Sequence, residues 1–477
     1  MNPLHPNWMD GMQDWPEEAK QRIHTLEEKN QILLKENQQL KELLSNFEKR
    51  LNTLEQENSE LKQKIIKLEN KLRQYENPHT PPSRKRFKKQ KTKKQHGKRG
   101  APKGHRGATR TTPKPDEIIP VTTNSCPCCG QQPGEGTAVE TVTIEELPPP
   151  QKVMVKQYEL HKYTCEHCGH QFTMTHEDCP QQGRFGVHTL SYVTLLRFHL
   201  RGVYRKIQDF LQYLSDFSIT PKGINDALLR VGEACKQEFN RLKQRVRSAQ
   251  WRHIDETHSP VNGENWWLWI FRTDGDDSLV VIRDSRGSNV VKEILGTEHS
   301  GANVTDGWRA YHYLHSVQRC WAHLLREVDS HKDISEEGRI LSEEIHKRFR
   351  LLKEFLGKDP PMQDRKKQKQ QWDQELADLV EKYEDSIHTK HLITYLKNGL
   401  GSWYTCLLHP GMPPTNNLGE QAIREHVIMR KIIGAFRSEK GSEYYQYIAS
   451  MFATWRFQGK NILEELENLL RKELCLS

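Results

Sequence analysis

The sequence predicts a multidomain protein with an N-terminal coiled coil, a zinc ribbon, a helical region and an α/β core that carries a helical insertion. Three observations lead to this fold class. Apolar residues repeat every seven positions from Ile23 to Tyr75, two Cys-x-x-Cys pairs follow, and strand-like segments after Arg247 end in acidic residues. The length of 477 residues also exceeds a single ordinary core, because domains commonly hold about 100 to 200 residues.

Composition narrows the class of protein. The net charge of +9 is concentrated in one stretch, and such asymmetry indicates a polyanionic partner, nucleic acid first. No apolar run approaches the roughly 20 residues that span a bilayer, and the N-terminus has no signal-peptide core. We therefore expect a soluble, cytoplasmic protein associated with the nucleoid, with no membrane contact and no disulfides.

Residues 17–76 form the predicted coiled coil. One core position holds Leu26, Leu33, Leu40, Phe47, Leu54, Leu61, Leu68 and Tyr75. An apolar seam with a 3.5-residue period is buried when two helices supercoil, so we expect a homodimer or a higher oligomer. Asn30, Asn37 and Asn58 lie at the other core position, where buried Asn favours a registered parallel dimer. The alternative is a long amphipathic helix folded back on its own chain.

Residues 77–120 form a predicted flexible basic arm. Pro78, Pro81 and Pro82 end the preceding helix, because proline lacks the main-chain donor. Thirteen of the residues from Arg84 to Arg110 are Lys or Arg and none is acidic. Such a stretch buries little apolar surface and is suited to phosphate contacts on DNA. A solubilising linker is the alternative.

Residues 121–180 form the predicted zinc ribbon. Its ligands are Cys126, Cys129, Cys165 and Cys168, each pair followed by glycine. A two-residue gap lets one tight turn supply two thiolates, and four thiolates close a structural tetrahedral Zn²⁺ site. Between the pairs, 153–155 and 158–163 alternate like strands of a hairpin. Cys128, His167 and His170 are possible competing ligands.

Residues 185–247 read as helical throughout. Residues 203–214 form one helix, and Thr220-Pro221 combines an N-cap with a first-turn proline to open the next. The pair resembles a DNA-binding helix-turn-helix, although a generic helical hairpin fits the sequence as well.

Residues 248–330 form the first part of the predicted core. Its strands are 251–255, 266–273, 279–283 and 303–305, with a helix at 288–295 before the last strand. Three strands, a helix and a fourth strand constitute a ribonuclease H-like order, in which the first and fourth strands lie side by side at the sheet centre. This order places Asp255 and Asp306 near each other. Carboxylates are the ligands that Mg²⁺ prefers, and two ions can clamp an in-line displacement at phosphorus.

Four motifs resemble those of the insertion sequence 66 family of transposases. They are His253-Ile254-Asp255-Glu256-Thr257, Thr305-Asp306-Gly307-Trp308 with Tyr311, Cys320-Trp321-Ala322-His323, and Asn416-Asn417-Leu418-Gly419-Glu420 with Arg424 and Arg430-Lys431. The zipper, the Gly-rich segment 99–107 and the zinc module are similar as well. The resemblance implies a catalytic triad of Asp255, Asp306 and Glu420 that binds Mg²⁺ or Mn²⁺. Gln421 departs from the arginine common in the family.

Glu420 depends on this resemblance more than the two aspartates do, because other glutamates lie nearby. We expect Asn416 to cap the helix that carries Glu420. Arg424, one turn later, would contact a phosphate, steady Glu420 or form a plain surface pair. We expect His323 to face the active site; half of a second metal site with Cys320 is the alternative.

Residues 331–400 form a predicted helical insertion, and 401–477 complete the core. An apolar stripe at 341, 345, 349 and 352 ends before Asp359-Pro360-Pro361. The whole pattern predicts a DNA transposase that binds element ends and cuts and joins strands, with accessory element proteins as further candidate partners. A zipper-dimerised regulator with an inactive nuclease-like fold and a nuclease without joining activity are the alternatives.

Overall fold

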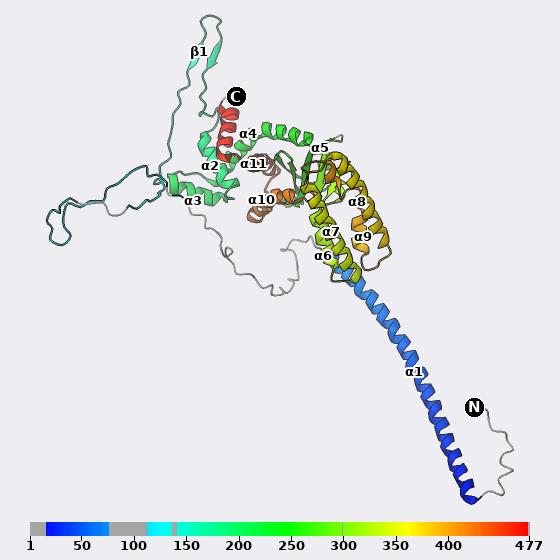
Figure 1. Cartoon of the computed structure of the whole chain (residues 1–477). Helices are drawn as coiled ribbons and strands as arrows, with labels where there is room; N and C mark the ends of the chain where they lie inside the picture. The colour runs from blue at the N-terminus through cyan, green and yellow to red at the C-terminus, as the bar shows by residue number, and fades with distance from the viewer. Residues whose placement is uncertain (1–15, 76–110, 112, 136–140, 298, 476–477) are drawn as a thin grey trace. The chain divides into compact units, whose positions relative to one another are not determined.

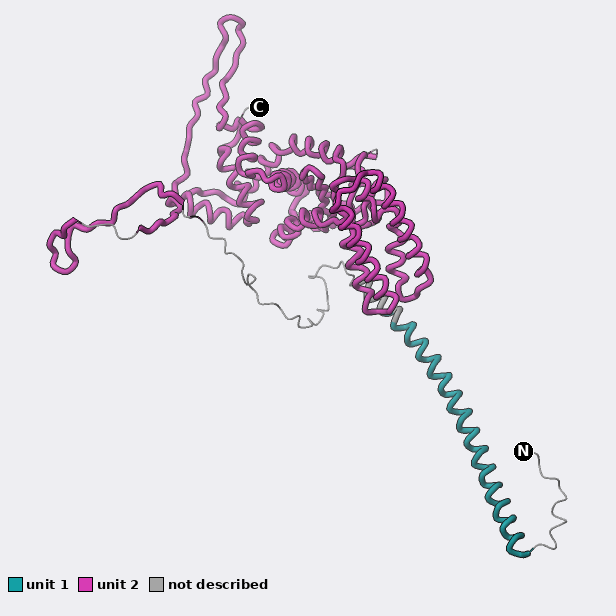
Figure 2. Tube along the Cα trace, in the orientation of Figure 1, with its two compact units in different colours: residues 1–94 teal, residues 95–477 magenta. Residues whose placement is uncertain are grey.

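The computed structural model describes residues 16–75, 111, 113–135, 141–297 and 299–475 (Figure 1). The chain divides into two compact units, residues 1–94 and 95–477 (Figure 2). The basic run 84–110 lies outside the described residues, so its role as a DNA-contacting arm stays a prediction. Within the described part of the chain, no helix is both long and apolar enough to cross a membrane.

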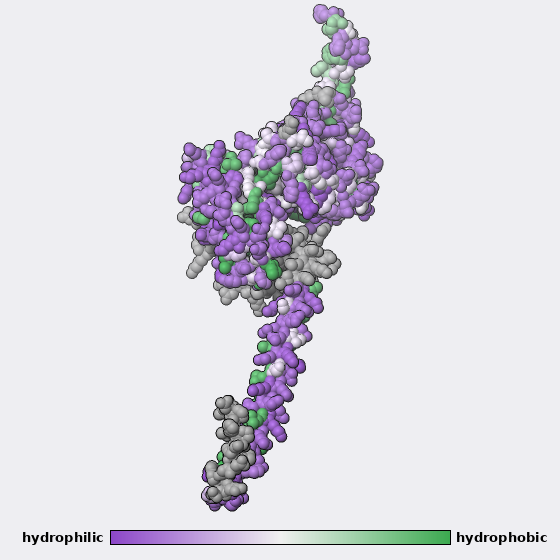
Figure 3. Space-filling view, turned by 90° about the vertical axis from the view of Figure 1, so that its right-hand side faces the viewer, coloured by the Kyte–Doolittle hydropathy of each residue, from purple (hydrophilic) through white to green (hydrophobic). Residues whose placement is uncertain are grey.

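The first unit contains one long helix, α1 (Glu17–Tyr75), of 59 residues. Its apolar side chains appear as separate spots on a hydrophilic helix (Figure 3). The leucines at the predicted core position are each at least 50% exposed; they are Leu26, Leu33, Leu40, Leu54, Leu61 and Leu68. The helix matches the heptad prediction, and its pairing with a second chain stays a prediction.

The second unit begins with a hairpin and three helices. Strands β1 (Lys162–Thr164) and β2 (Gln171–Thr173) pair antiparallel across the second cysteine pair, whereas residues 153–155, predicted as strand-like, form no strand. Helices α2 (Val187–Phe198), α3 (Tyr204–Ser215) and α4 (Pro221–Ser248) follow. The hydroxyl of Thr220 accepts a hydrogen bond from the N–H of Gly223 (3.1 Å), which confirms the predicted N-cap of α4. These helices share one apolar core with the sheet rather than forming a separately packed module.

The central sheet has the strand order β5-β4-β3-β6-β7. The strands are β3 (Trp251–His258), β4 (Trp267–Thr273), β5 (Ser278–Arg283), β6 (Ala302–Thr305) and β7 (Val317–Arg319). The first three pair antiparallel, while β6 runs parallel to β3 and to β7. The predicted first and fourth strands, β3 and β6, are therefore neighbours at the sheet centre, an order compatible with a nuclease-like core.

Helix α11 (Glu439–Phe457) seals the edge strand β5. The main-chain N–H groups of Ser278, Val280 and Ile282 donate to side chains of α11, over 3.0, 2.8 and 3.1 Å. The acceptors are Thr454, Ser450 and Gln446. Four helical residues rise ~6 Å and two strand residues ~6.6 Å, so a helix with polar residues every fourth position matches the strand. The edge is thereby closed to pairing with another chain.

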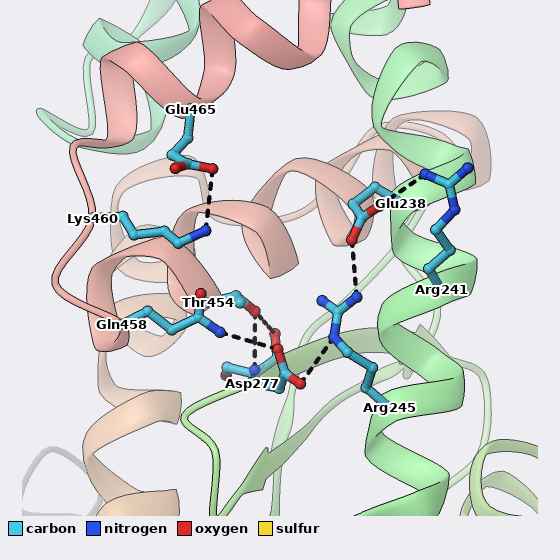
Figure 4. Close-up of polar contacts among 9 residues, drawn as sticks. Glu238, Arg241, Arg245, Asp277, Thr454, Gln458, Lys460 and Glu465 are labelled. Carbon is cyan, nitrogen blue, oxygen red and sulfur yellow. Dashed lines mark hydrogen bonds and ion pairs between the residues drawn. The ribbon is translucent and has the colours of Figure 1, made fainter. Parts of the chain in front are cut away.

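Charged residues fasten the turn between β4 and β5 to the neighbouring helices (Figure 4). Asp277 accepts hydrogen bonds from Arg245 of α4 (3.0 Å) and from Gln458, which follows α11 (3.2 Å). Arg245 also pairs with Glu238 on its own helix (2.9 Å). These contacts hold α4 and α11 against one end of the sheet.

The remaining helices either pack around the sheet or form the predicted insertion. They are α5 (Ser288–Leu295), α6 (Trp321–His331), α7 (Glu336–Gly357), α8 (Met362–Lys382), α9 (Lys390–Lys397), α10 (Asn417–Ile433) and α12 (Ile462–Leu470), with short turns η2 (Arg309–Tyr311), η3 (Thr405–Leu408) and η4 (Arg471–Cys475). Helices α6 to α9 enclose a second apolar core that includes the predicted stripe residues Leu341, Ile345 and Leu352. The predicted break at Pro360-Pro361 separates α7 from α8.

Candidate active site

Asp255 and Asp306 lie at the central strand pair of the sheet. In the parallel register of β3 and β6, His253 is opposite Val304. Two residues further along, Asp255 is level with Asp306, which directly follows β6. The sheet therefore brings two acids together that are 51 residues apart in the sequence.

The carboxylate of Asp255 is surrounded by negative charge. It keeps a small exposed edge, yet packing of protein around it is the main cause that raises its pKa well above the ordinary range. The charges of Glu256, Asp306 and Glu420 raise this pKa further, while a hydrogen bond from the N–H of Glu256 (2.9 Å) lowers it. The charges of the other two predicted acids, Asp306 and Glu420, thus both act on Asp255. Among the described residues, however, the oxygen atoms of the three acids do not all lie within 4.8 Å of one another.

Glu420 is carried by the first turn of α10, and Asn416 ties this helix to β3, the strand of Asp255. The fully buried Asn416 side chain donates to the carbonyl oxygen of Ile254 (3.0 Å) and contacts Nδ1 of His253 (2.9 Å). The expectation that this side chain caps α10 is wrong, because its polar atoms are used by β3. Burial lowers the pKa of His253 to about 4, so this ring is neutral at pH 7.

Helix α6 supplies the polar neighbours of Glu420. Nη2 of Arg326 lies 2.8 Å from Oε1 of Glu420, and Nδ1 of His323 lies 3.8 Å from the same oxygen. His323 therefore faces Glu420, as expected from the sequence. Arg326 is a residue that sequence reasoning missed, and its only signal was a position three residues after His323 on the same helix.

Arg424 lies away from this group. It is exposed on α10, and within the described part of the chain it forms no ion pair with Glu420. The neighbouring Glu425 is held by two hydrogen bonds from Arg201, at 2.5 and 2.7 Å. The possibility that Arg424 steadies Glu420 is therefore not realised in this structure, and Arg326 occupies that place.

Glu256 forms a second buried acidic position beside the triad. Its side chain is 1% exposed, pairs with Arg286 (2.8 Å) and accepts a hydrogen bond from the hydroxyl of Tyr311. Burial, and then the charge of Asp306, raise the pKa of Glu256.

Arg286 itself lies over the rings of Trp267 and Trp308, 4.7 and 4.1 Å from their centres. Glu256 and Tyr311 both lie within the motifs shared with the transposase family, and their contact with each other could not be foreseen from the sequence.

The turn after Asp306 requires glycine. Gly307 has φ +94°, and a Cβ at this position would overlap the guanidinium of Arg319. Arg319 lies over the rings of Tyr395 and Trp403, and the hydroxyl of Tyr395 reaches the carbonyl oxygen of Asp306 (3.5 Å). Helix α9 of the insertion therefore contacts the backbone of a catalytic candidate.

Comparison with known proteins places the chain in a family. The family model described as Transposase IS66 family matches residues 182–444, more than half of the chain. The chain belongs to the IS66 family of transposases. The matched segment of this IS66-family transposase includes all three acids, α6 and the helical insertion, and a transposase acts on DNA. No curated protein matches the chain in sequence.

The cysteine pairs of the IS66-family transposase precede the matched segment and form two similar turns. The N–H groups of Gly130 and Gly169 donate to the carbonyl oxygens of Cys126 and Cys165, each over 2.8 Å, and both glycines have φ near +70°. Hydrogen bonds from main-chain N–H groups lower the pKa of the Cys126 and Cys165 thiols. These turns suit thiolate ligation.

Among the described residues, the four sulfurs do not form one group within 4.8 Å of one another. The predicted Zn²⁺ site of Cys126, Cys129, Cys165 and Cys168 therefore stays a prediction.

Proposed function

We propose that this transposase cleaves and joins DNA at the ends of its element by metal-dependent phosphoryl transfer, with Asp255, Asp306 and Glu420 as the metal-binding acids. The observation that carries this proposal is the placement of Asp255 level with Asp306 on the central strand pair, where Asp306 and Glu420 both act on Asp255; burial first, and these charges after it, raise the pKa of Asp255. Clusters of perturbed acids are typical of catalytic sites.

The donor set fits a divalent metal. Asp255 lies in β3, Asp306 directly follows the adjacent strand β6, and Glu420 comes from α10, which packs on β3; all three offer the oxygen ligands that Mg²⁺ and Mn²⁺ take. Divalent cations bound there would activate the attacking oxygen and offset charge on the phosphoryl group. A bound cation would also reduce the electrostatic repulsion between the carboxylate of Asp255 and the neighbouring carboxylates.

Residues around the triad position it and add positive charge. Arg326, 40% exposed, holds Glu420 and presents part of its guanidinium to solvent beside the site. Asn416 fixes the start of α10 to β3, and Tyr395 contacts the backbone at Asp306. Arg286, stacked between two tryptophans, is a second cation near the acids that can approach a DNA phosphate.

The remaining parts of the chain are assigned to DNA binding and assembly. The basic run 84–110 supplies phosphate contacts, the zinc module and α2 to α4 bind element ends, and α1 pairs protomers. Accessory element proteins can add to this assembly.

The test uses the full chain with DNA that carries the ends of its element. Asp255→Asn, Asp306→Asn and Glu420→Gln each keep shape but remove a metal-binding charge, so each should abolish Mg²⁺-dependent cleavage and joining while DNA binding persists. Joining of a pre-cut 3′ hydroxyl end to target DNA separates a transposase from a nuclease. A wild-type protein that binds these ends yet neither cuts nor joins them with Mg²⁺ or Mn²⁺ would refute the proposal and favour a regulator.

A further inference from the structure

A second group of metal-ligating side chains lies in the helical part of the protein. Among the described residues, Glu327, His331 and His391 each offer a ligand atom, and these atoms lie within 4.8 Å of one another. Glu327 and His331 are on α6, and His391 is in the first turn of α9. Oε1 of Glu327 lies 3.0 Å from Nδ1 of His391 and 3.9 Å from Nδ1 of His331.

The spacing has a simple structural origin. Residues four apart share one face of a helix, so Glu327 and His331 project from α6 toward the same neighbour. Helix α9 is that neighbour, and its first turn places His391 opposite them. The rings of His331 and His391 are nearly parallel, with 6.1 Å between centres and 7° between planes. Three ligands from two helices thus converge from two sides.

The donor set selects a different metal from that of the catalytic acids. Two imidazoles and one carboxylate suit Zn²⁺ or a similar first-row divalent ion, whereas Mg²⁺ prefers oxygen ligands alone. The side chains of Glu327 and His331 are 5% and 2% exposed, while His391 is 69% exposed. The group is therefore buried on the side of Glu327 and His331 and open to solvent at His391, so an ion can enter there together with a water molecule as the fourth ligand.

Neighbouring groups already orient one of the rings. Nδ1 of His331 lies 3.0 Å from the main-chain carbonyl oxygen of Glu327 and 3.1 Å from the hydroxyl of Ser330. These contacts fix the orientation of the His331 ring, as the outer hydrogen bonds of ligating histidines usually do.

We propose that Glu327, His331 and His391 bind one Zn²⁺ ion that fastens α6 to α9. The same face of α6 carries His323, four residues before Glu327, which faces Glu420. The other helix carries Tyr395, which contacts the backbone at Asp306. An ion at this clamp would stabilise both helices that border the catalytic acids. The inference goes beyond the proposed chemistry and depends on none of the three acids.

The test measures bound zinc in the full-length protein. Wild type, His391→Ala and His388→Ala are equilibrated with the same free Zn²⁺, and metal per chain is determined by mass spectrometry. His388 is an exposed histidine three residues from His391, so its variant is a matched control. We expect His391→Ala to bind about one equivalent less than both other proteins, because a two-ligand site holds the ion weakly. Cysteine-bound zinc is common to all three and cancels in the difference.

Thermal melting gives the second readout. Zn²⁺ should raise the Tm of wild type and His388→Ala more than that of His391→Ala, because a ligand that binds only the folded state stabilises it. In EDTA, His391→Ala should melt lower than the other two proteins, because it removes the 3.0 Å partner of the buried Glu327 carboxylate; the quantity compared is therefore each protein's shift in Tm from EDTA to Zn²⁺. Equal zinc content and equal Zn²⁺-dependent shifts in Tm in wild type and His391→Ala would overturn the proposal. The three side chains would then only link α6 and α9 by hydrogen bonds.

Discussion

Replacing Asn416 by alanine should weaken the catalytic core and its chemistry together. The side chain of Asn416 bridges the helix of Glu420 and the strand of Asp255 through the carbonyl oxygen of Ile254 and the ring of His253. Alanine keeps the backbone but removes both contacts. The start of α10 would then be held to β3 without this bridge.

The magnitude follows from the groups left behind. Two buried polar atoms, the oxygen of Ile254 and Nδ1 of His253, would lose a partner, at about 1–3 kcal/mol each. The free energy of unfolding should therefore fall by about 2–6 kcal/mol. A displacement of Glu420 by as little as ~1 Å would lower cleavage roughly 100-fold.

The assay compares Asn416→Ala with Asn417→Ala in thermal melting and in single-turnover cleavage of end DNA. Asn417 is the adjacent, exposed asparagine of the same helix, so its loss should change little. The reasoning is refuted if the two variants melt alike and cleave alike.

Three further predictions concern stability, metal content and assembly. In EDTA, Asp255→Asn should be more stable than wild type by roughly 0.5–2 kcal/mol at pH 7. Because the pKa of Asp255 is raised in the folded state, its ionised carboxylate destabilises the folded protein as pH rises above the ordinary carboxyl pKa, so the two proteins should become equally stable in acid. A variant less stable than wild type at pH 7 would contradict this. Cys126→Ser with Cys165→Ser should remove about one zinc per chain by metal analysis, and unchanged zinc would rule out the ribbon site. Deleting residues 1–76 should give a mainly monomeric protein by light scattering, whereas an unchanged oligomer would place the interface elsewhere.

The sequence predicts the central sheet well because its signals are local. Short runs of apolar residues mark β4 and β5, and the predicted helix 288–295 has the observed bounds. The position of Asp255 beside Asp306 then follows from strand order alone. Strand β7 (Val317–Arg319) has three residues, too few for a period of two to be recognised.

The tertiary contacts of the site could not be predicted in the same way. Asn416 precedes a helix, so local rules assign its side chain to a cap, yet its partners are in β3, more than 160 residues earlier. The pairs Glu256–Arg286 and Arg326–Glu420 likewise join distant segments. One sequence contains no information on such pairs beyond the charges themselves.

The most direct test of the triad compares two glutamates on one helix. Glu420→Gln and Glu425→Gln are made in the full chain, and Mg²⁺-dependent cleavage of element-end DNA is measured in a single turnover. Glu420 faces the acids, whereas Glu425 is bound to Arg201. We predict that Glu420→Gln is inactive although it binds DNA, and that Glu425→Gln cleaves. An active Glu420→Gln beside an inactive Glu425→Gln would contradict the assignment.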